Sequence, residues 1–503
     1  MSLLRNFGWV GTLSLVGIGV SFASQLVFSY YFGTTMALDA YWVAFAIMNF
    51  LAFPLISLRE ALVSEIHERS NVDMQHASAY FSKALSLILV IALIGSTAGL
   101  IFSNVFIQWI AGSKNLAFHT EVFHKLLWLA PALILLALAD TFNALLTSYN
   151  RTILQMGSRV LGASSTIAVI ALAANWIGSQ ALVLGFVVGQ ALNVLVLTVI
   201  LYRQGLSFRP TMPVGLGANF LKLTGALFCS YGINQIYAIY EKSTFLNFGV
   251  GLVSAFQYSV SVTNIVVTVL GLSLANLLWP RFLNHVSTQN TQHFYAEGAL
   301  SSKLLLLVLG WVCALIFLHA QWVVQTVFAR GAFAQEAVLL TTLCLQMTIF
   351  AAIPISINFV LGRAMISARA SKSIMVIGFS TAIMGMVVLS LANYLHEARL
   401  AMGFWLLANL LGCILSGVLF MRKTQVSAVT YRNTLWWILR YALVLVATVS
   451  LAFEFLSQYV FSQYGLIDVV CKSLLFTVLY SSLTFLLGLF KGIPLGSLVK
   501  RSS

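Results

Sequence analysis

Charged residues are scarce in this chain of 503 residues. Aspartate, glutamate, lysine and arginine together make up 8% of it, whereas 60% of the residues are hydrophobic. Soluble domains carry about 25% charged residues. This scarcity excludes an ordinary soluble protein and predicts an integral membrane protein, and the 34 glycines spread through the apolar runs suit transmembrane helices.

Motifs for metal or nucleotide chemistry are also missing. The five cysteines show no CxxC spacing, which argues against zinc sites and disulfide frameworks. No GxxxxGK[ST] sequence is present, so direct use of ATP is not expected. The net charge of +14 comes from scattered basic residues, which indicates membrane topology rather than nucleic-acid binding. No loop could hold a catalytic domain, so we expect neither an enzyme nor a cofactor.

What the sequence has in abundance is apolar stretches long enough to cross a bilayer. A spanning helix needs about 20 mostly apolar residues. Fourteen stretches meet this length, and they predict an all-α polytopic membrane protein. They are residues 8–31, 38–62, 82–110, 123–147, 158–177, 180–202, 217–240, 251–278, 300–321, 337–362, 372–394, 400–421, 433–457 and 467–490.

The distribution of lysine and arginine predicts the orientation. Cytoplasmic loops of membrane proteins carry an excess of both residues. If the N-terminus is cytoplasmic, 20 lysines and arginines, with Arg59 and Arg159 among them, lie on the cytoplasmic side and five lie on the outer side; Arg440 and Lys472 lie within predicted helices and are not counted. The outer set is Lys114, Lys125, Lys242, Arg330 and Arg399. Both termini are therefore expected in the cytoplasm.

Two weak internal repeats divide the chain. "FGTTMALDAYWVAF" from Phe32 resembles "FGVGLVSAFQYSVS" from Phe248, and the turn at Arg151 resembles the turn at Arg369. Both pairs lie six predicted helices apart, as expected of a transporter built from related halves. We expect two six-helix lobes, residues 1–212 and 213–425, and a terminal helix pair in residues 426–503.

Several motifs together resemble one family. "FGTTMALDAYWVAFAIMNFL" is similar to the first loop and second helix of the lipid II flippase (MviN-type) family, within the multidrug/oligosaccharidyl-lipid/polysaccharide (MOP) exporter superfamily. "PALILLALADTFNALLTSYNRTILQMGSRVLG", "VTVLGLSLANLLWPRFLNH" and "VFARGAFAQEAV" resemble its fourth helix, its eighth helix and the loop after the ninth. The matches run over about residues 1–380.

The resemblance implies a flippase of the bacterial inner membrane that moves an undecaprenyl-diphosphate-linked oligosaccharide, or a lipid II-like precursor, to the periplasmic leaflet by alternating access. It implies coupling to the membrane potential, H⁺ or Na⁺, a hydrophobic groove for the lipid tail on the last two helices, and polysaccharide polymerase or glycosyltransferase partners. Peptidoglycan members carry cavity arginines where this chain has Ile18, Ser24, Ala52 and Ser261. We therefore expect an exopolysaccharide or O-antigen cargo. The alternatives are a cation-coupled multidrug exporter and a non-transporting scaffold of an envelope assembly complex.

Five residues are candidates for substrate binding. A diphosphate in an apolar cavity needs cations, and ionisable residues at membrane depth are usually functional. Arg59 is the first candidate, against a snorkelling arginine paired with Glu60 or Glu65. Asp140 and Asn358 lie eleven residues before Arg151 and Arg369, and the alternative for Asp140 is an interhelical hydrogen bond. The complete set is Arg59, Asn49, Asp140, Asn358 and Lys242.

A second set of residues is assigned to gating or structure. Asp39 is expected to start the second helix as an N-cap or first-turn acid before any gating role. Glu241 is expected to pair locally with Lys242, with a gate as the alternative. Kinks or hinges are predicted at the helix prolines. The complete set is Asp39, Glu60, Glu241, Pro54, Pro131 and Pro354.

Overall fold

The architecture is helical throughout the part of the chain that the structure describes. A computed structural model describes residues 3–70, 74–112, 116–148, 151–203, 218–368, 370–424, 428–458 and 465–489. Within these ranges twelve helices are long and apolar enough to cross a membrane, and the shorter apolar helix Val16–Phe32 adds to them. The predicted all-α polytopic class is confirmed, whereas the count of fourteen spans stays a prediction.

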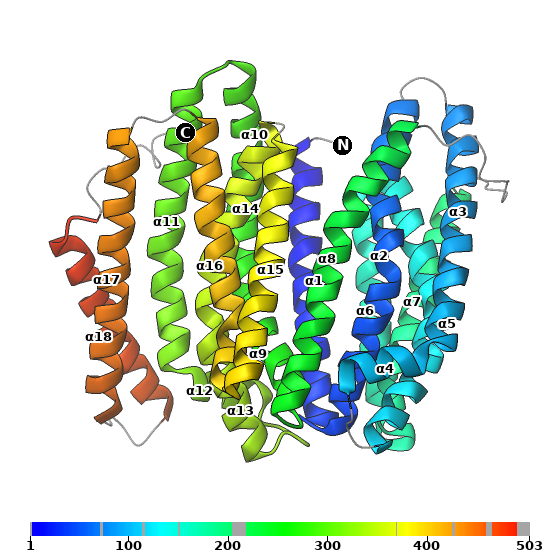
Figure 1. Cartoon of the computed structure of the whole chain (residues 1–503), viewed down its shortest axis with the longest axis horizontal. Coiled ribbons are helices and arrows are strands. Elements are labelled where there is room, and N and C mark those ends of the chain that lie inside the picture. The colour runs from blue at the N-terminus through cyan, green and yellow to red at the C-terminus, as the bar shows by residue number, and fades with distance from the viewer. Residues whose placement is uncertain are drawn as a thin grey trace. The chain divides into compact units, whose positions relative to one another are not determined.

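The helix bounds are as follows: α1 Leu3–Phe32, α2 Met36–Ser70, α3 Met74–Ile101, α4 Ser103–Ala111, α5 Leu116–Ser148, α6 Thr152–Ile177, α7 Gln180–Arg203, α8 Ala218–Phe248, α9 Leu252–Val266, η1 Val267–Leu272, α10 Ser273–Ser287, α11 Thr291–Leu318, α12 Ala320–Phe328, α13 Gln335–Thr348, η2 Ile349–Ala351, α14 Ala352–Ser367, α15 Ser371–Leu395, α16 Ala398–Lys423, α17 Ala428–Gln458 and α18 Gly465–Leu486. Figure 1 labels these helices and colours them from blue at the N-terminus to red at the C-terminus.

The chain forms two compact units. The first comprises residues 1–258, 327–341 and 385–401, and the second comprises residues 259–326, 342–384 and 402–503. In the first unit α2 packs against α3, α5 and α8, and α6 packs against α1 and α7. In the second unit α14 packs against α10 and α11. The division into lobes at residues 212 and 425 stays a prediction.

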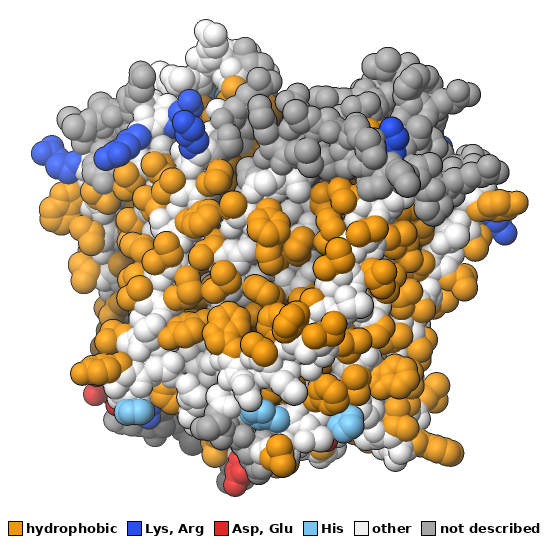
Figure 2. Space-filling view, turned by 45° about the vertical axis from the view of Figure 1, so that its right-hand side comes forward, with side chains coloured by type: hydrophobic (Ala, Val, Ile, Leu, Met, Phe, Trp, Pro, Cys, Tyr) orange, Lys and Arg blue, Asp and Glu red, His pale blue; other side chains and the backbone are white. Residues whose placement is uncertain are grey.

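Large apolar side chains are exposed on the outward surfaces of the helices. Figure 2 shows hydrophobic side chains over the middle of the visible face, and lysine, arginine, histidine and acidic side chains toward its ends. Trp176, Tyr394 and Phe485 are each exposed by 75% or more. In water such surfaces would drive association. In a bilayer they are the expected exterior, because the lipid tails are also apolar and the backbone polar groups are paired inside each helix.

Four predicted spans are interrupted. Phe102 separates α3 from α4, and His319 separates α11 from α12. The π-helical segment η1 follows α9, and the 3-10 segment η2 precedes α14. Pro354 explains η2, since a proline lacks the N–H that would bond to the carbonyl four residues earlier, in this case Phe350. The hydropathy pattern contains no comparable marker for η1.

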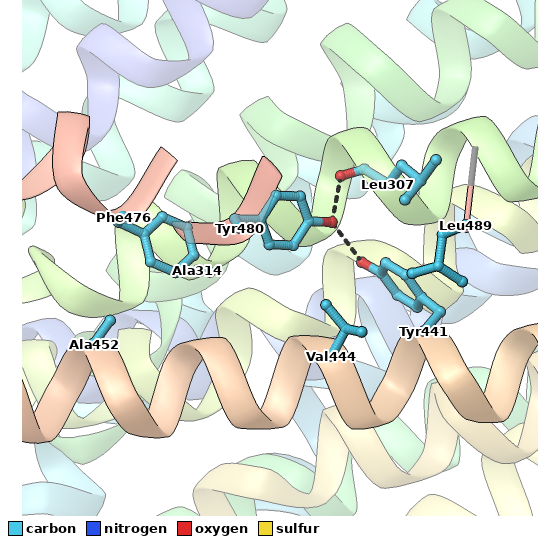
Figure 3. Packing of buried hydrophobic residues seen from close by; sticks show 8 residues of the cluster. All are labelled: Leu307, Ala314, Tyr441, Val444, Ala452, Phe476, Tyr480 and Leu489. Carbon is cyan, nitrogen blue, oxygen red and sulfur yellow. Dashed lines mark hydrogen bonds between the residues drawn. The ribbon is translucent and has the colours of Figure 1, made fainter. Parts of the chain in front are cut away.

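The last two helices pack on α11 around two buried tyrosines, and we call this contact the C-terminal junction (Figure 3). The Tyr480 hydroxyl donates to the Leu307 carbonyl at 2.9 Å, and the Tyr441 hydroxyl donates to the Leu306 carbonyl. A Cβ at Gly310 would overlap the Tyr441 hydroxyl, so glycine permits this close approach. The predicted lipid-tail groove on these helices stays a prediction.

Candidate functional site

A cavity of about 590 Å³ lies within the first unit, and we call it the polar cavity. Four helices each supply residues at positions i, i+3, i+4 and i+7, which is one face of a helix. They are Ser21, Ser24, Gln25 and Phe28 of α1; Leu136, Ala139, Asp140 and Asn143 of α5; Arg159, Gly162, Ala163 and Thr166 of α6; and Phe186, Gly189, Gln190 and Asn193 of α7.

The second helix lines the same cavity at two distant levels. Tyr41, Trp42 and Phe45 lie in its first turns, and Arg59 lies far along it. Eighteen residues separate Tyr41 from Arg59, which is five helical turns, so both side chains lie on one face roughly 27 Å apart along the axis. Pro54 lies between them inside α2. The cavity therefore has an aromatic end and a charged end.

The charged end consists of two arginines around one carboxylate. Arg59 Nη1 lies 3.2 Å from Asp140 Oδ1, and Arg159 Nη2 lies 3.9 Å from the same oxygen. The Asp140 carboxylate thus lies within ion-pair distance of both guanidinium groups. Because a carboxylate removed from water is stable only when it is paired, the arginines explain why Asp140 is tolerated here.

Arg59 and Asp140 were predicted separately from the sequence, and the structure brings them together. Arg159 was predicted only as a cytoplasmic topology residue, so the second arginine of the cluster was missed. A search for polar residues at i, i+3, i+4 and i+7 could have found it, because Arg159 and Thr166 are seven residues apart on α6. The same pattern on α7 includes Gln190 and Asn193.

Close packing of α6 and α7 shapes one wall of the polar cavity. A Cβ on Gly189 would lie 2.7 Å from the Gly162 carbonyl oxygen, and a Cβ on Gly162 would lie 2.9 Å from the Gly189 carbonyl oxygen. Both distances are shorter than real Cβ atoms show. The two glycines thus allow the helix backbones to meet directly, as small residues do in membrane helix pairs.

Asp39 bonds to a different helix from the one that carries it. It lies in the first turn of α2, in agreement with its predicted place as a first-turn acid. Its carboxylate, however, accepts hydrogen bonds from the backbone N–H of Gly251 at 2.5 Å, from the N–H of Ser254 at 2.8 Å and from the Ser254 hydroxyl at 2.5 Å. These donors form the N-terminus of α9, which favours a negative charge. Asp39 therefore joins two helices through contacts between residues more than 200 positions apart in the sequence.

The other candidates lie outside the polar cavity. Glu241 and Lys242 are buried and paired with each other, and Lys242 Nζ lies 5.9 Å from the centre of the Phe256 ring. In the second unit, Asn358 of α14 accepts a hydrogen bond from Ser416 of α16 at 2.8 Å. Asn49 is half-buried on α2.

Three further assignments concern a proline inside a helix and two residues whose side chains lie outside the described part of the chain. Pro131 lies inside α5. The backbone of Glu60 continues α2, but its side chain is outside the described residues, as is Arg369. Among the residues that the structure describes, no group of three His, Cys, Asp or Glu could hold a metal ion.

Residues 28–475 match the family model described as "Lipid II flippase MurJ". A protein of Borreliella burgdorferi described as "Probable lipid II flippase MurJ" is 23% identical over 322 residues, which cover 63% of this chain and 63% of that protein. A protein of the same description from Buchnera aphidicola subsp. Baizongia pistaciae is 22% identical over 366 residues, 68% of each chain. The chain thus spans less than two thirds of the Borreliella relative.

Two solved structures are similar in fold. "Lipid II flippase MurJ, inward closed conformation" superposes with a TM-score of 0.77 at 14% identity, covering 95% of this chain and 98% of that one. An inward-facing multidrug resistance MATE family transporter of the MOP superfamily gives a TM-score of 0.68 at 14% identity, covering 83% and 96%. At these identities the likeness is one of fold.

Proposed function

The chain belongs to the lipid II flippase MurJ family, and on that premise we propose that it moves a polyprenyl-diphosphate-linked sugar from the cytoplasmic to the periplasmic leaflet of the bacterial inner membrane. The observation that carries this proposal is the cluster of Arg59, Asp140 and Arg159 in the polar cavity. A diphosphate is the anionic part of such a lipid. A guanidinium binds phosphate through two parallel N–H donors, so two arginines suit this group.

Asp140 has a separate role in the proposal. In the absence of cargo its carboxylate pairs with both arginines and offsets part of their positive charge in a medium of low dielectric constant. An arriving diphosphate competes with the carboxylate for the same N–H donors. Release of the cargo restores the pairs with Asp140, so the empty state remains stable.

The cargo in this proposal is an exopolysaccharide or O-antigen repeat unit rather than lipid II. The support is the resemblance itself, because peptidoglycan members carry arginines where this chain has Ile18, Ser24, Ala52 and Ser261. Ser24 lines the polar cavity, so this departure lies in the site. Ala52 is fully buried. An arginine at this position would need a partner, because burying an unpaired charge is costly.

Transport in this proposal uses alternating access with both termini in the cytoplasm. The hydrogen bonds from α9 to Asp39 hold the predicted periplasmic ends of α2 and α9 together and would break when that side opens. The membrane potential, H⁺ or Na⁺ would drive the cycle. A glycosyltransferase would supply the cargo and a polysaccharide polymerase would consume it.

Reconstituted vesicles test the proposal. The purified chain would be placed in vesicles with a labelled undecaprenyl-diphosphate-linked sugar, and a membrane-impermeant glycosidase would report its arrival in the outer leaflet. We expect Arg59→Ala to lower the rate about 100-fold, because truncation of one member of a partly buried charge pair that also holds the cargo costs roughly 2–5 kcal/mol.

The matched control is Arg281→Ala. Arg281 also pairs with an acid, Glu297, but it is exposed and lies outside the polar cavity. We expect the rate of this variant to stay within about twofold of the unmodified chain, because exposed ion pairs contribute little. An Arg59→Ala,Arg159→Ala double variant with an unchanged rate would disprove the assignment of the diphosphate to this cluster.

A second candidate function is the export of organic cations, which the fold likeness to a MATE family transporter favours. The same vesicles loaded with a cationic dye distinguish it, since a multidrug exporter would move the dye in a Na⁺ or H⁺ gradient. A third candidate is a non-transporting scaffold, and it predicts that cells tolerate substitution of Arg59 and Asp140.

A further inference from the structure

Four buried polar atoms of the polar cavity have no hydrogen-bond partner among the described residues. Three are carboxamide oxygens, on Gln25, Asn143 and Asn193, and the fourth is the indole nitrogen of Trp42. Buried polar groups in folded proteins are almost always paired, and in a low-dielectric interior an unpaired one is costly. Four of them around one cavity indicate a bound molecule that supplies the missing partners.

The chemistry of these atoms selects the partner. A carboxamide oxygen accepts hydrogen bonds, whereas the indole N–H donates one. An ionised phosphate has no donor and would be repelled by the three oxygens. A hydroxyl both donates and accepts, so a group with several hydroxyls can satisfy all four atoms.

Aromatic side chains supply the apolar part of the same site. The Trp42 ring lies 5.3 Å from the Tyr41 ring and 6.1 Å from the Phe45 ring, centre to centre. The Phe45 ring in turn lies 5.4 Å from Phe186 of α7. A sugar ring has a C–H face that packs on an aromatic surface and hydroxyls at its edge, and small-molecule sites combine these features. The aromatic end of the cavity thus complements a sugar.

The carboxamides also connect the charged end to the aromatic end. Asn143 lies one helical turn from Asp140 on α5. The side chain of Asn193 lies against Gly162 of α6, which is one turn from Arg159. Gln25 lies on α1 one turn before Phe28, whose ring is 6.0 Å from Trp42. A molecule with phosphate at one end and hydroxyls further along would match this order.

We infer that the polar cavity holds a neutral, hydroxyl-rich sugar unit through Gln25, Asn143, Asn193 and Trp42, with the aromatic end as its apolar platform. This rests on the proposed function, because the sugar arrives attached to the diphosphate bound by Arg59 and Arg159. A sugar that carries a carboxylate is disfavoured, since the carboxylate would face acceptor oxygens.

Binding to the full chain in lipid nanodiscs tests the inference with three radiolabelled probes. They are undecaprenyl diphosphate alone, the same lipid carrying one neutral N-acetylhexosamine, and the same lipid carrying one uronic acid. We expect the neutral sugar to strengthen binding about tenfold over the bare lipid, the equivalent of one or two hydrogen bonds. The uronic acid should give no such gain.

Variants locate the effect. In Asn143→Ala and Asn193→Ala the sugar-dependent gain should fall to about twofold or less, while binding of the bare lipid stays unchanged. Arg59→Ala should instead weaken all three probes by the same factor. Asn409→Ala is the matched control, because the Asn409 amide donates to the Trp405 carbonyl of its own helix, and this variant should keep the gain.

The outcomes separate the two proposals. If the unmodified chain binds the bare lipid and gains nothing from the sugar, the diphosphate site stands and the sugar site is rejected. The sugar site is also rejected if Asn143→Ala and Asn193→Ala keep the full gain, which would mean that only water fills these positions. If no probe binds, the proposed function fails and the sugar site fails with it.

Discussion

The polar cavity and the C-terminal junction place similar chemical groups in opposite situations. In the junction both tyrosine hydroxyls donate to backbone carbonyls of α11, and Trp311 donates to Thr477 at 3.1 Å. In the cavity the carboxamide oxygens of Asn143 and Asn193 lack partners within the described chain. Unpaired polar groups are costly in a membrane interior. Polar groups that are paired within the protein therefore indicate a structural contact, whereas buried polar atoms without a partner indicate a ligand site.

Filling the cavity wall would have the largest effect. In Gly189→Leu the new side chain must displace Thr166 or push α6 away from α7. Overpacking of this kind costs about 1–3 kcal/mol, and here it also occupies the cavity. We expect a lower midpoint of thermal unfolding in detergent together with loss of flipping. Gly157→Leu is the control on α6, because a Cβ there meets no atom within 4 Å; equal losses in both variants would contradict this explanation.

Opening the junction should reduce stability without affecting transport. Tyr480→Phe removes the hydroxyl that donates to Leu307 and leaves the ring in place. We expect a loss of about 1 kcal/mol in the free energy of unfolding, the usual contribution of one hydrogen bond, and a normal flipping rate. The measurements are thermal unfolding of the purified chain and the vesicle assay. A reduced flipping rate without a loss of stability would contradict this prediction and show that the junction takes part in transport.

Removal of a polar group from the polar cavity should not lower the free energy of unfolding, in contrast to its removal from the C-terminal junction. Asn143→Leu replaces a buried group that has an unpaired oxygen with an apolar side chain of similar size. We expect the free energy of unfolding to stay equal or to rise by about 0.5–1 kcal/mol, because no hydrogen bond of that oxygen is lost. Thermal unfolding without cargo measures it. A destabilisation as large as that of Tyr480→Phe would contradict this prediction, because it would mean that the Asn143 side chain stabilises the fold as the paired tyrosine does.

The smallest effect concerns a charge at the edge of the junction. Burial lowers the pKa of His319, and the nearby Lys472 cation lowers it further, while Asp468 acts in the opposite direction. The His319 ring lies 3.1 Å from the Ser473 hydroxyl. The unfolded chain therefore binds a proton at a higher pH than the folded chain, and stability should fall as the pH drops below about 6.5. His319→Gln should flatten this part of the profile of unfolding midpoint against pH; an identical slope would exclude His319.

Family membership was accessible from short motifs, and the match over residues 28–475 confirms that resemblance. Arg59 and Asp140 were also accessible, since a charge within an apolar run is conspicuous. Asn143 and Asn193 were not, because an amide in a helix has no distinctive local pattern until the helix face that carries it is known. Arg159 was predicted as a topology residue, because an arginine near the end of a predicted helix fits the positive-inside rule as well as a cavity site.

A bundle of membrane helices follows from the amino-acid pattern without further information. In lipid each backbone N–H and C=O must be paired, and long apolar runs can meet that demand only as helices. The pairing of polar groups, by contrast, follows only from how the helices pack. The Asp39 carboxylate bonds to Gly251 and Ser254, and Arg59 pairs with Asp140 across 81 residues. These pairs depend on which helix faces touch, and the apolar surfaces that cover most helices are too alike to specify that from local sequence.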